Sequence, residues 1–317
     1  MTETSAAALD EQLRTLTGLL TAGSAEDREA ACARLRRIAD PADDEVRALV
    51  APPLLALAEV ERDARVLPGL VRALAATYDP RALPVLTGLA GHPEAEVRRA
   101  VAESLTALET ERADGPDVAA LLALAEDADP EVRAWAVFAL GSQLTAYGPA
   151  IRAALHERLD DVDEDVVDEA VRGLARRQEG AVTELLAELL EDESDDPHPI
   201  TLHAAAALGR AELLPALREL DADQPLVAAA LAACDPERRE QLAASAWQLV
   251  EALERLRPDL AAALCSERFS PDVDLLLPGA PDPARYSVPH LLRRAGEDPS
   301  RAASLVDEDL PVAATAP

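Results

Sequence analysis

The segment Leu122–Gly141, LALAEDADPEVRAWAVFALG, holds two apolar runs that are separated by an acidic turn ending in Asp-Pro. In the second run, Val132, Ala136 and Leu140 are spaced by four residues, which places them on one face of a helix. An aspartate followed by proline is a favourable helix start, so Asp129 is expected to cap this helix and Pro130 to occupy its first turn. The segment therefore predicts two helices joined by a short turn.

The second run recurs along the chain at intervals of 31 to 35 residues. The copies are VLPGLVRAL from Val66, VRRAVAESL from Val97, VRAWAVFAL from Val132, VVDEAVRGL from Val166 and ITLHAAAAL from Ile200, with weaker copies ending at Leu35 and following Pro225. The first, fifth and ninth positions of every copy are apolar. A Leu-rich segment precedes each copy, so each repeat is expected to be a helix A, a short turn and a helix B. Gly141, Gly173 and Gly209 are expected near the ends of B helices, as left-handed caps.

The pattern in DPEVRAWAVFALG and HPEAEVRRAVAESL resembles the HEAT repeat, of the HEAT-like type first described in phycobilisome lyases. The resemblance covers roughly residues 9 to 235. It implies an Asp–Arg ladder between successive repeats, for which Asp129, Arg133 and Arg98 match the family pattern, whereas Val167 and Thr201 depart from it. Members of this family serve as scaffolds, as carriers and in some cases as enzymes, so the resemblance is specific for the fold and weak for the function.

The fold expected from the repeats is all-α: a right-handed α-solenoid of about six to seven HEAT-like helical hairpins, with an irregular Pro-rich C-terminal tail. One helical hairpin cannot bury its own apolar face, but stacked hairpins share a continuous core. We expect the array to span residues 1–235, with B helices lining a concave surface. Closing helices with Trp247 are expected in residues 236–268, and the tail in residues 269–317.

Composition and charge exclude several classes of function. Hydrophobic residues make up 49% of the chain but aromatic residues only 2%, which favours close helix packing over a β-sandwich. The net charge of −30 repels phosphate, so neither nucleic acid nor an anionic membrane is an expected partner. All basic residues are arginine, and the absence of lysine excludes Schiff-base and phosphate-loop chemistry.

Cysteine usage and the N-terminal sequence favour a cytoplasmic protein. Cys32, Cys234 and Cys265 are odd in number and form no metal-binding spacing. The first residues are polar and acidic, unlike a signal peptide, and no apolar run is long enough to cross a membrane.

The candidate partner-binding site comes from two columns of the repeat alignment. The column three residues after the valine holds Gly69, Ala100, Trp135, Glu169 and His203, and the column six residues after it holds Arg72, Glu103, Phe138, Arg172 and Ala206. Because these columns accept charged residues, they are expected to face solvent on helix B. Trp135 and Phe138 would then form an exposed apolar patch, or alternatively fill a bulge between helices. The full set of expected partner-binding residues is Trp135, Phe138, Glu103, Glu169, Arg172, His203, Arg99 and Arg176.

An acidic run from Asp160 to Asp196 covers two successive A–B turns. It could dock a basic partner or hold a divalent cation loosely, but a solvated, solubilising edge is the favoured interpretation. No calcium-loop motif is present in it.

Catalysis has little support in the sequence. The five histidines are scattered, and the chain has one His-Glu pair, His156-Glu157, where HEAT-type deoxyhypusine hydroxylases need four. We therefore expect no catalytic residue, no metal and no cofactor, and the favoured function is a non-catalytic scaffold that binds another protein or peptide, with a basic partner as one option. The alternative is a HEAT-like lyase or chaperone that binds a small hydrophobic ligand or chromophore in the same groove.

The segment ARYSVPHLLRRAG is basic and amphipathic and contains one predicted short helix. It is expected either to fold into the groove, in cis or in trans, or to cap the last repeat.

Overall fold

The computed structural model describes residues 3–21, 24–40, 42, 44–192, 197–267, 270–276 and 284–310. The chain divides into two compact units, Met1–Gly173 and Leu174–Pro317. The boundary falls inside one helix and differs from the division expected at residue 235. Each unit is described by itself below.

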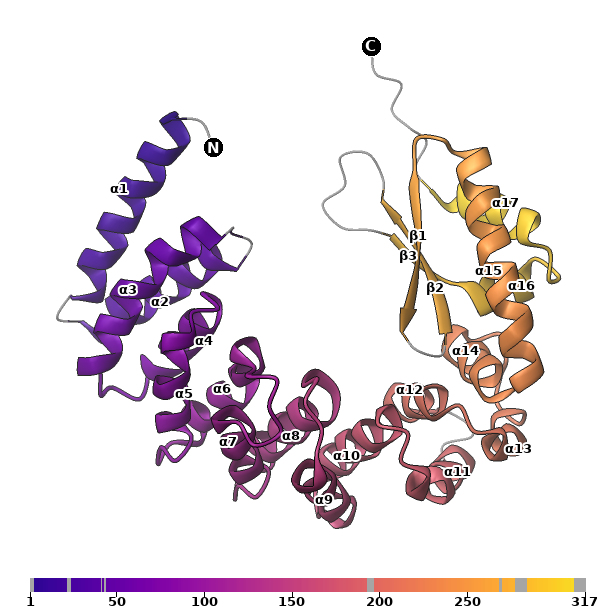
Figure 1. Cartoon of the computed structure of the whole chain (residues 1–317), viewed down its shortest axis with the longest axis horizontal. Coiled ribbons are helices and arrows are strands. Elements are labelled where there is room, and N and C mark those ends of the chain that lie inside the picture. The colour runs from indigo at the N-terminus through magenta and orange to yellow at the C-terminus, as the bar shows by residue number, and fades with distance from the viewer. Residues whose placement is uncertain are drawn as a thin grey trace. The chain divides into compact units, whose positions relative to one another are not determined.

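The first unit is a row of helical hairpins that follow one another in chain order (Figure 1). The hairpins are α1 (Glu3–Leu20) with α2 (Ala25–Ala39), α3 (Asp44–Val60) with α4 (Leu67–Ala75), α5 (Leu83–Leu89) with α6 (Ala95–Ser104), α7 (Pro116–Leu124) with α8 (Pro130–Phe138), and α9 (Pro149–Glu157) with α10 (Glu164–Arg176). Short 3₁₀ turns lie at Pro80–Ala82, Leu105–Leu108 and Arg158–Asp160, and a π-helical turn, η3, spans Ala139–Gln143. The B helices α2, α4, α6 and α8 pack in succession, as do the A helices α5, α7 and α9.

The second unit continues the same pattern and ends in a different fold. Its hairpins are α11 (Thr183–Asp192) with α12 (Pro199–Leu208) and α13 (Leu214–Leu217) with α14 (Pro225–Cys234), with 3₁₀ turns at Gly180–Val182 and Ala211–Leu213. After them come α15 (Pro236–Leu256), β1 (Ala261–Glu267), β2 (Ser270–Leu276), β3 (Ala284–Ser287), α16 (Val288–Arg294) and α17 (Pro299–Asp309). The described helices thus form an α-solenoid of hairpins, as the repeats predict.

The three apolar columns of the repeat form the core of this solenoid. Val66, Val97, Val132 and Val166 are fully buried, and so are the residues four and eight positions after each of them. In the last copy Ile200 is half-buried, while Ala204 and Leu208 are buried. The four-residue spacing therefore identified the buried face of helix B correctly.

Asp129 caps α8, as predicted, but the ladder is built from other aspartates. The Asp129 carboxylate accepts hydrogen bonds from the N–H groups of Glu131 and Val132. The Arg98 guanidinium instead binds both carboxylate oxygens of Asp127, at 2.6 and 2.8 Å. The assignment of Asp129 to the ladder was therefore wrong, because its carboxylate is committed to the end of its own helix.

Arg133 repeats the arrangement one hairpin later, where it binds both oxygens of Asp161 at 3.0 and 2.6 Å. We call the pairs Arg98–Asp127 and Arg133–Asp161 the guanidinium ladder. Each ladder arginine also donates to two carbonyl oxygens of its own A–B turn. Each ladder aspartate accepts in addition an N–H two residues further on, from Asp129 or Asp163. The ladder therefore holds each turn to the next.

Of the three glycines expected as helix caps, one is a cap. Gly209 follows α12 with φ of 61°, in the left-handed region. Gly141 lies in the π-helical turn and Gly173 lies inside α10, so for these two the prediction was wrong. A Cβ atom on Gly141 would lie 2.6 Å from the Cα of Gly173, and a Cβ on Gly173 would lie 2.7 Å from the Cα of Gly141. The two glycines are needed because the backbones meet there with no room for a side chain.

The C-terminal segment is not an irregular tail in the residues that the structure describes. β1, β2 and β3 form an antiparallel sheet in that order, with Leu264 opposite Val273 and Val273 opposite Tyr286. Val273 and Leu275 are buried, whereas Asp274 between them pairs with Arg285 at 2.8 Å. The sequence lacks a helical period there because the side chains alternate with the period of a strand.

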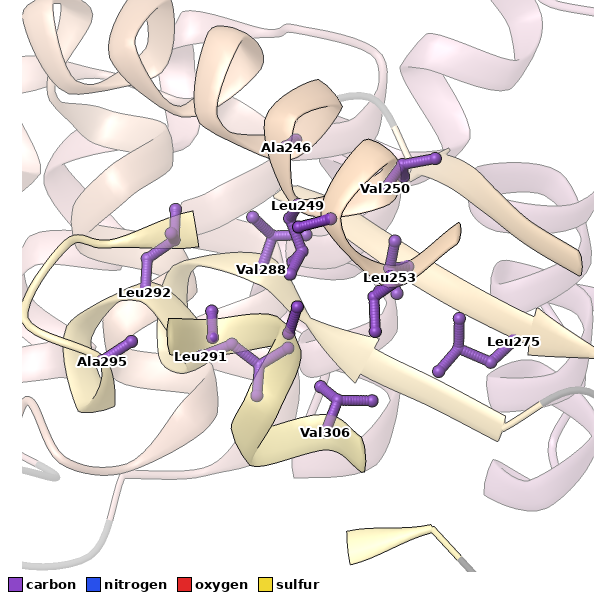
Figure 2. Packing of buried hydrophobic residues seen from close by; sticks show 14 of the residues in the cluster. Ala246, Leu249, Val250, Leu253, Leu275, Val288, Leu291, Leu292, Ala295 and Val306 are labelled. Atoms are coloured by element: carbon purple, nitrogen blue, oxygen red, sulfur yellow. The ribbon is translucent and has the colours of Figure 1, made fainter. Parts of the chain in front are cut away.

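A second hydrophobic core joins this sheet to α15, α16 and α17 (Figure 2). Figure 2 shows Leu249 and Leu253 of α15 close to Val288 of α16 and Leu275 of β2. The short helix α16 was predicted, and its apolar side packs on α14 and on this core, while Arg293 pairs with Asp223 at 3.1 Å. These contacts agree with a cap on the last hairpin, one of the two roles expected for this segment.

Candidate interaction surface on the B helices

The two aromatic residues of α8 make an edge-to-face pair. The ring centroids of Trp135 and Phe138 are 5.8 Å apart, and the ring planes are inclined by 71°. They are three positions apart in the sequence, so they stand on the same side of the helix. Trp135 is 36% exposed, whereas Phe138 is half-buried. The expected exposed patch is thus largely the indole of Trp135, with Phe138 fixing its orientation from one side.

An arginine from the next B helix covers Phe138. The guanidinium carbon of Arg172 lies 4.5 Å from the centre of the Phe138 ring, within the range of a cation–π contact. Arg172 also forms an ion pair with Glu169 at 2.5 Å, one turn earlier on α10. Burial raises the pKa of the Glu169 carboxyl above its usual value, and the positive charge of Arg172 opposes this in part. Arg172 therefore binds a ring and a carboxylate at once.

On the other side of the aromatic pair, ion pairs connect α4, α6 and α8. Arg72 of α4 binds Glu103 at 2.8 Å and Glu96 at 3.4 Å. Arg99 of α6 binds Glu96 at 2.5 Å and Glu131 of α8 at 3.4 Å, and lies 3.8 Å from Glu103. The charged residues of this face are thus paired with one another across three hairpins.

The structure brings most of the predicted site residues together in the first unit. They form two groups of contacts on neighbouring B helices: Trp135, Phe138, Arg172 and Glu169 in one, and Arg99 and Glu103 in the other. Ala100, from the same column as Trp135, is buried. His203 and Arg176 belong to the second unit, where both are exposed, and their part in the site stays a prediction.

The described residues contain no group of three or more His, Cys, Asp or Glu side chains that could hold a metal ion. Cys32 and Cys234 are buried, and burial raises the pKa of each thiol to about 12, so neither is a ready nucleophile. Within the acidic run, Asp161 is already bound to Arg133, while residues 193–196 lie outside the described part of the chain. An open cavity of about 420 Å³ lies among α1, α2 and α3, lined by Leu20, Leu57 and other residues.

A second exposed tryptophan was not predicted as part of a site. Trp247 of α15 is 63% exposed, more than Trp135. It lies outside the repeat alignment, so no column marked it as solvent-facing. The sequence does hold a signal for its exposure. Glu251, four residues later, shares a helix face with Trp247, and the apolar residues of this helix lie on a different face.

A family model of HEAT repeats matches residues 51–141 and 117–209, which together make up half of the chain. The chain belongs to the HEAT-repeat family. No curated protein matches the sequence closely. Among the helices described, none is long and apolar enough to cross a membrane.

Solved structures of other helical repeat proteins resemble this HEAT-repeat chain. YIBA_ECOLI, a protein of Escherichia coli, is 23% identical with a TM-score of 0.57, and the match covers 71% of this chain and 81% of that one. The CpcE–CpcF complex of phycocyanin lyase from Nostoc is 20% identical with a TM-score of 0.46, covering 70% and 86%. Kap95p, in a structure with RanGDP, is 17% identical with a TM-score of 0.48, covering 81% and 39%. At these identities the likeness concerns the fold alone.

Proposed function

We propose that this protein is a non-catalytic interaction module that binds a protein or peptide on the B-helix face around Trp135. The observation that carries the proposal is the edge-to-face pair of Trp135 and Phe138, with Arg172 lying over the Phe138 ring. Glu131, one turn before Trp135 on α8, forms an ion pair with Arg99 of the preceding B helix. A large aromatic side chain in a fixed orientation loses little entropy on binding, which is a property of interface hot spots.

The charged residues support the same proposal. Because Arg72, Arg99 and Arg172 each have carboxylate partners on this face, a ligand would meet a network that is already ordered. Such a rim gives specificity and excludes water, and the aromatic centre supplies most of the affinity. The buried thiols of Cys32 and Cys234 are compatible with the proposed cytoplasmic location.

The test is site-specific crosslinking from this face. A photoreactive phenylalanine analogue placed at position 135 would be irradiated in cells, and the crosslinked partner identified by mass spectrometry. The Trp135→Ala/Phe138→Ala variant would then be compared with wild type for recovery of that partner. The control is Leu49→Ala, which removes an apolar side chain that is 52% exposed on α3 of the same unit.

We expect the double variant to lose at least about thirtyfold in affinity, because a single hot-spot aromatic residue contributes about 2 kcal/mol or more. Leu49→Ala should bind as wild type does. Equal recovery of the partner by the double variant would refute the proposal. A small hydrophobic molecule that co-purifies with wild type and is lost from the double variant would instead favour the lyase or chaperone alternative.

A further inference from the structure

The long helix α15 has one face in the second core and an opposite face in solvent. Leu249 and Leu253 point into the core (Figure 2). Trp247 lies on the solvent side and is 63% exposed. Single exposed leucines or valines are common on protein surfaces, but a tryptophan exposes more apolar area and is the residue most enriched at binding hot spots.

The residues that share the exposed face of α15 with Trp247 are small or acidic. We call this set, together with Trp247, the α15 stripe. Its other members lie three, four or seven residues from Trp247 and are all exposed: Glu240, Ala243, Ala244, Glu251 and Glu254. The two alanines leave the indole uncovered on the N-terminal side. The glutamates place carboxylates before and after it.

The glutamates of the α15 stripe differ from those beside Trp135. Glu103 and Glu131 on the B helices are bound to arginines. In the described part of the chain, by contrast, no ion pair involves Glu240, Glu251 or Glu254. Arg255 lies nearby, but its Nε donates to the backbone oxygen of Glu251 and not to the carboxylate. The stripe therefore places carboxylates that form no ion pair with a described residue around an open aromatic face.

We infer that the α15 stripe is a docking site for a basic peptide segment of a partner protein, with an arginine or lysine side chain stacked on Trp247 and paired with Glu251. The face of the Trp247 ring attracts a cation, and the carboxylate of Glu251, one helical turn away, can pair with the same positive charge. The net charge of −30 attracts a basic partner over longer distance. This surface is separate from the one proposed around Trp135, and either proposal can fail without the other.

The test uses the full chain and a short fluorescein-labelled peptide of alternating arginine and alanine, with binding followed by fluorescence anisotropy. Trp247→Ala should weaken binding about two- to fivefold, the range for an exposed cation–π contact. Glu251→Gln should weaken it about twofold or more. The same peptide with neutral citrulline in place of arginine should not bind measurably.

Two controls separate the stripe from general attraction by an acidic protein. Glu126→Gln removes the same charge from an exposed position of the first unit and should leave the affinity unchanged. Trp247→Phe keeps an aromatic face and should retain most of the affinity, whereas Trp247→Leu should not. All variants should melt as wild type does, because the changed side chains are exposed.

The inference is overturned if Trp247→Ala and Glu251→Gln bind the peptide as tightly as Glu126→Gln does, even when wild type binds it. It is also overturned if the leucine variant binds like wild type, since the contact would then be merely apolar. A concentration-dependent increase in mass that Trp247→Ala abolishes would assign the stripe to self-association and overturn it as well.

Discussion

Replacing Gly141 by alanine should destabilise the first unit, although alanine is the better helix former. The added Cβ would lie 2.6 Å from the Cα of Gly173 and 3.4 Å from a methyl group of Leu155. The nearer atom belongs to the backbone of α10 and cannot turn away as a flexible side chain could. The helices must therefore move apart by about 1 Å, since non-bonded carbon atoms normally lie about 3.5 Å or more from one another.

The expected net loss follows from two opposing terms. Overpacking of a core typically costs about 1–3 kcal/mol, with the upper end favoured for a backbone contact. The gain from replacing glycine by alanine in a helix is at most about 1 kcal/mol. We expect Gly141→Ala to lose about 1–2 kcal/mol, and Gly173→Ala a similar amount. The double variant should lose less than the sum, because the first Cβ already separates the helices.

Thermal and urea unfolding, followed by circular dichroism, would measure the effect. Each kcal/mol of lost stability should lower Tm by about 2–4 °C for a unit of this size. The matched control is Gly88→Ala in α5, where a new Cβ meets nothing within 4 Å. It should be neutral or stabilise by about 1 kcal/mol. If Gly141→Ala were as stable as Gly88→Ala, the close contact between the two backbones would be refuted.

Asp127→Asn should lower the free energy of unfolding in urea titrations by about 2–3 kcal/mol, because it leaves the largely buried Arg98 guanidinium without its counter-ion. The control is Asp114→Asn, which breaks the exposed pair with Arg112 and should cost under about 0.5 kcal/mol. Burial raises the pKa of Asp127 and of Asp161, but the hydrogen bonds from their arginines outweigh it and hold both pKa values below normal. The stability that these two carboxylates contribute is therefore complete above the unfolded-state pKa of about 3.9 and is lost as the pH falls below it. In acid titrations, Asp127→Asn should therefore lose stability less steeply than wild type. An equally steep loss would contradict this. Gly209→Ala should lower Tm, at a cost of about 1 kcal/mol, since alanine resists the φ of 61° that ends α12; an unchanged Tm would show that the cap relaxes.

The periodic parts of the structure were predictable from the sequence. The recurrence of Val66, Val97, Val132 and Val166 identified the B helices and their buried faces, because a four-residue spacing has one geometric meaning in a helix. The Asp129 cap was predictable for a similar reason, since capping depends on residues that are neighbours in the chain.

What the sequence could not decide depended on residues distant in the chain. Both Asp127 and Asp129 stand in the same turn, and only the position of Arg98, brought in from the preceding repeat, selects Asp127 for the ladder. Gly141 resembles a cap when considered alone, and its role depends on Gly173 in another hairpin.

The local units of this protein, which are the helices of the repeats, their buried faces and the Asp129 cap of α8, follow from the sequence alone. Those features depend on interactions between residues a few positions apart. The tertiary structure decided which residues pair across repeats, how Arg172 covers Phe138 while Trp135 stays partly exposed, and that the C-terminal segment packs as strands on α15. Such contacts depend on how the hairpins stack and how the sheet pairs, which a residue's immediate neighbours do not specify.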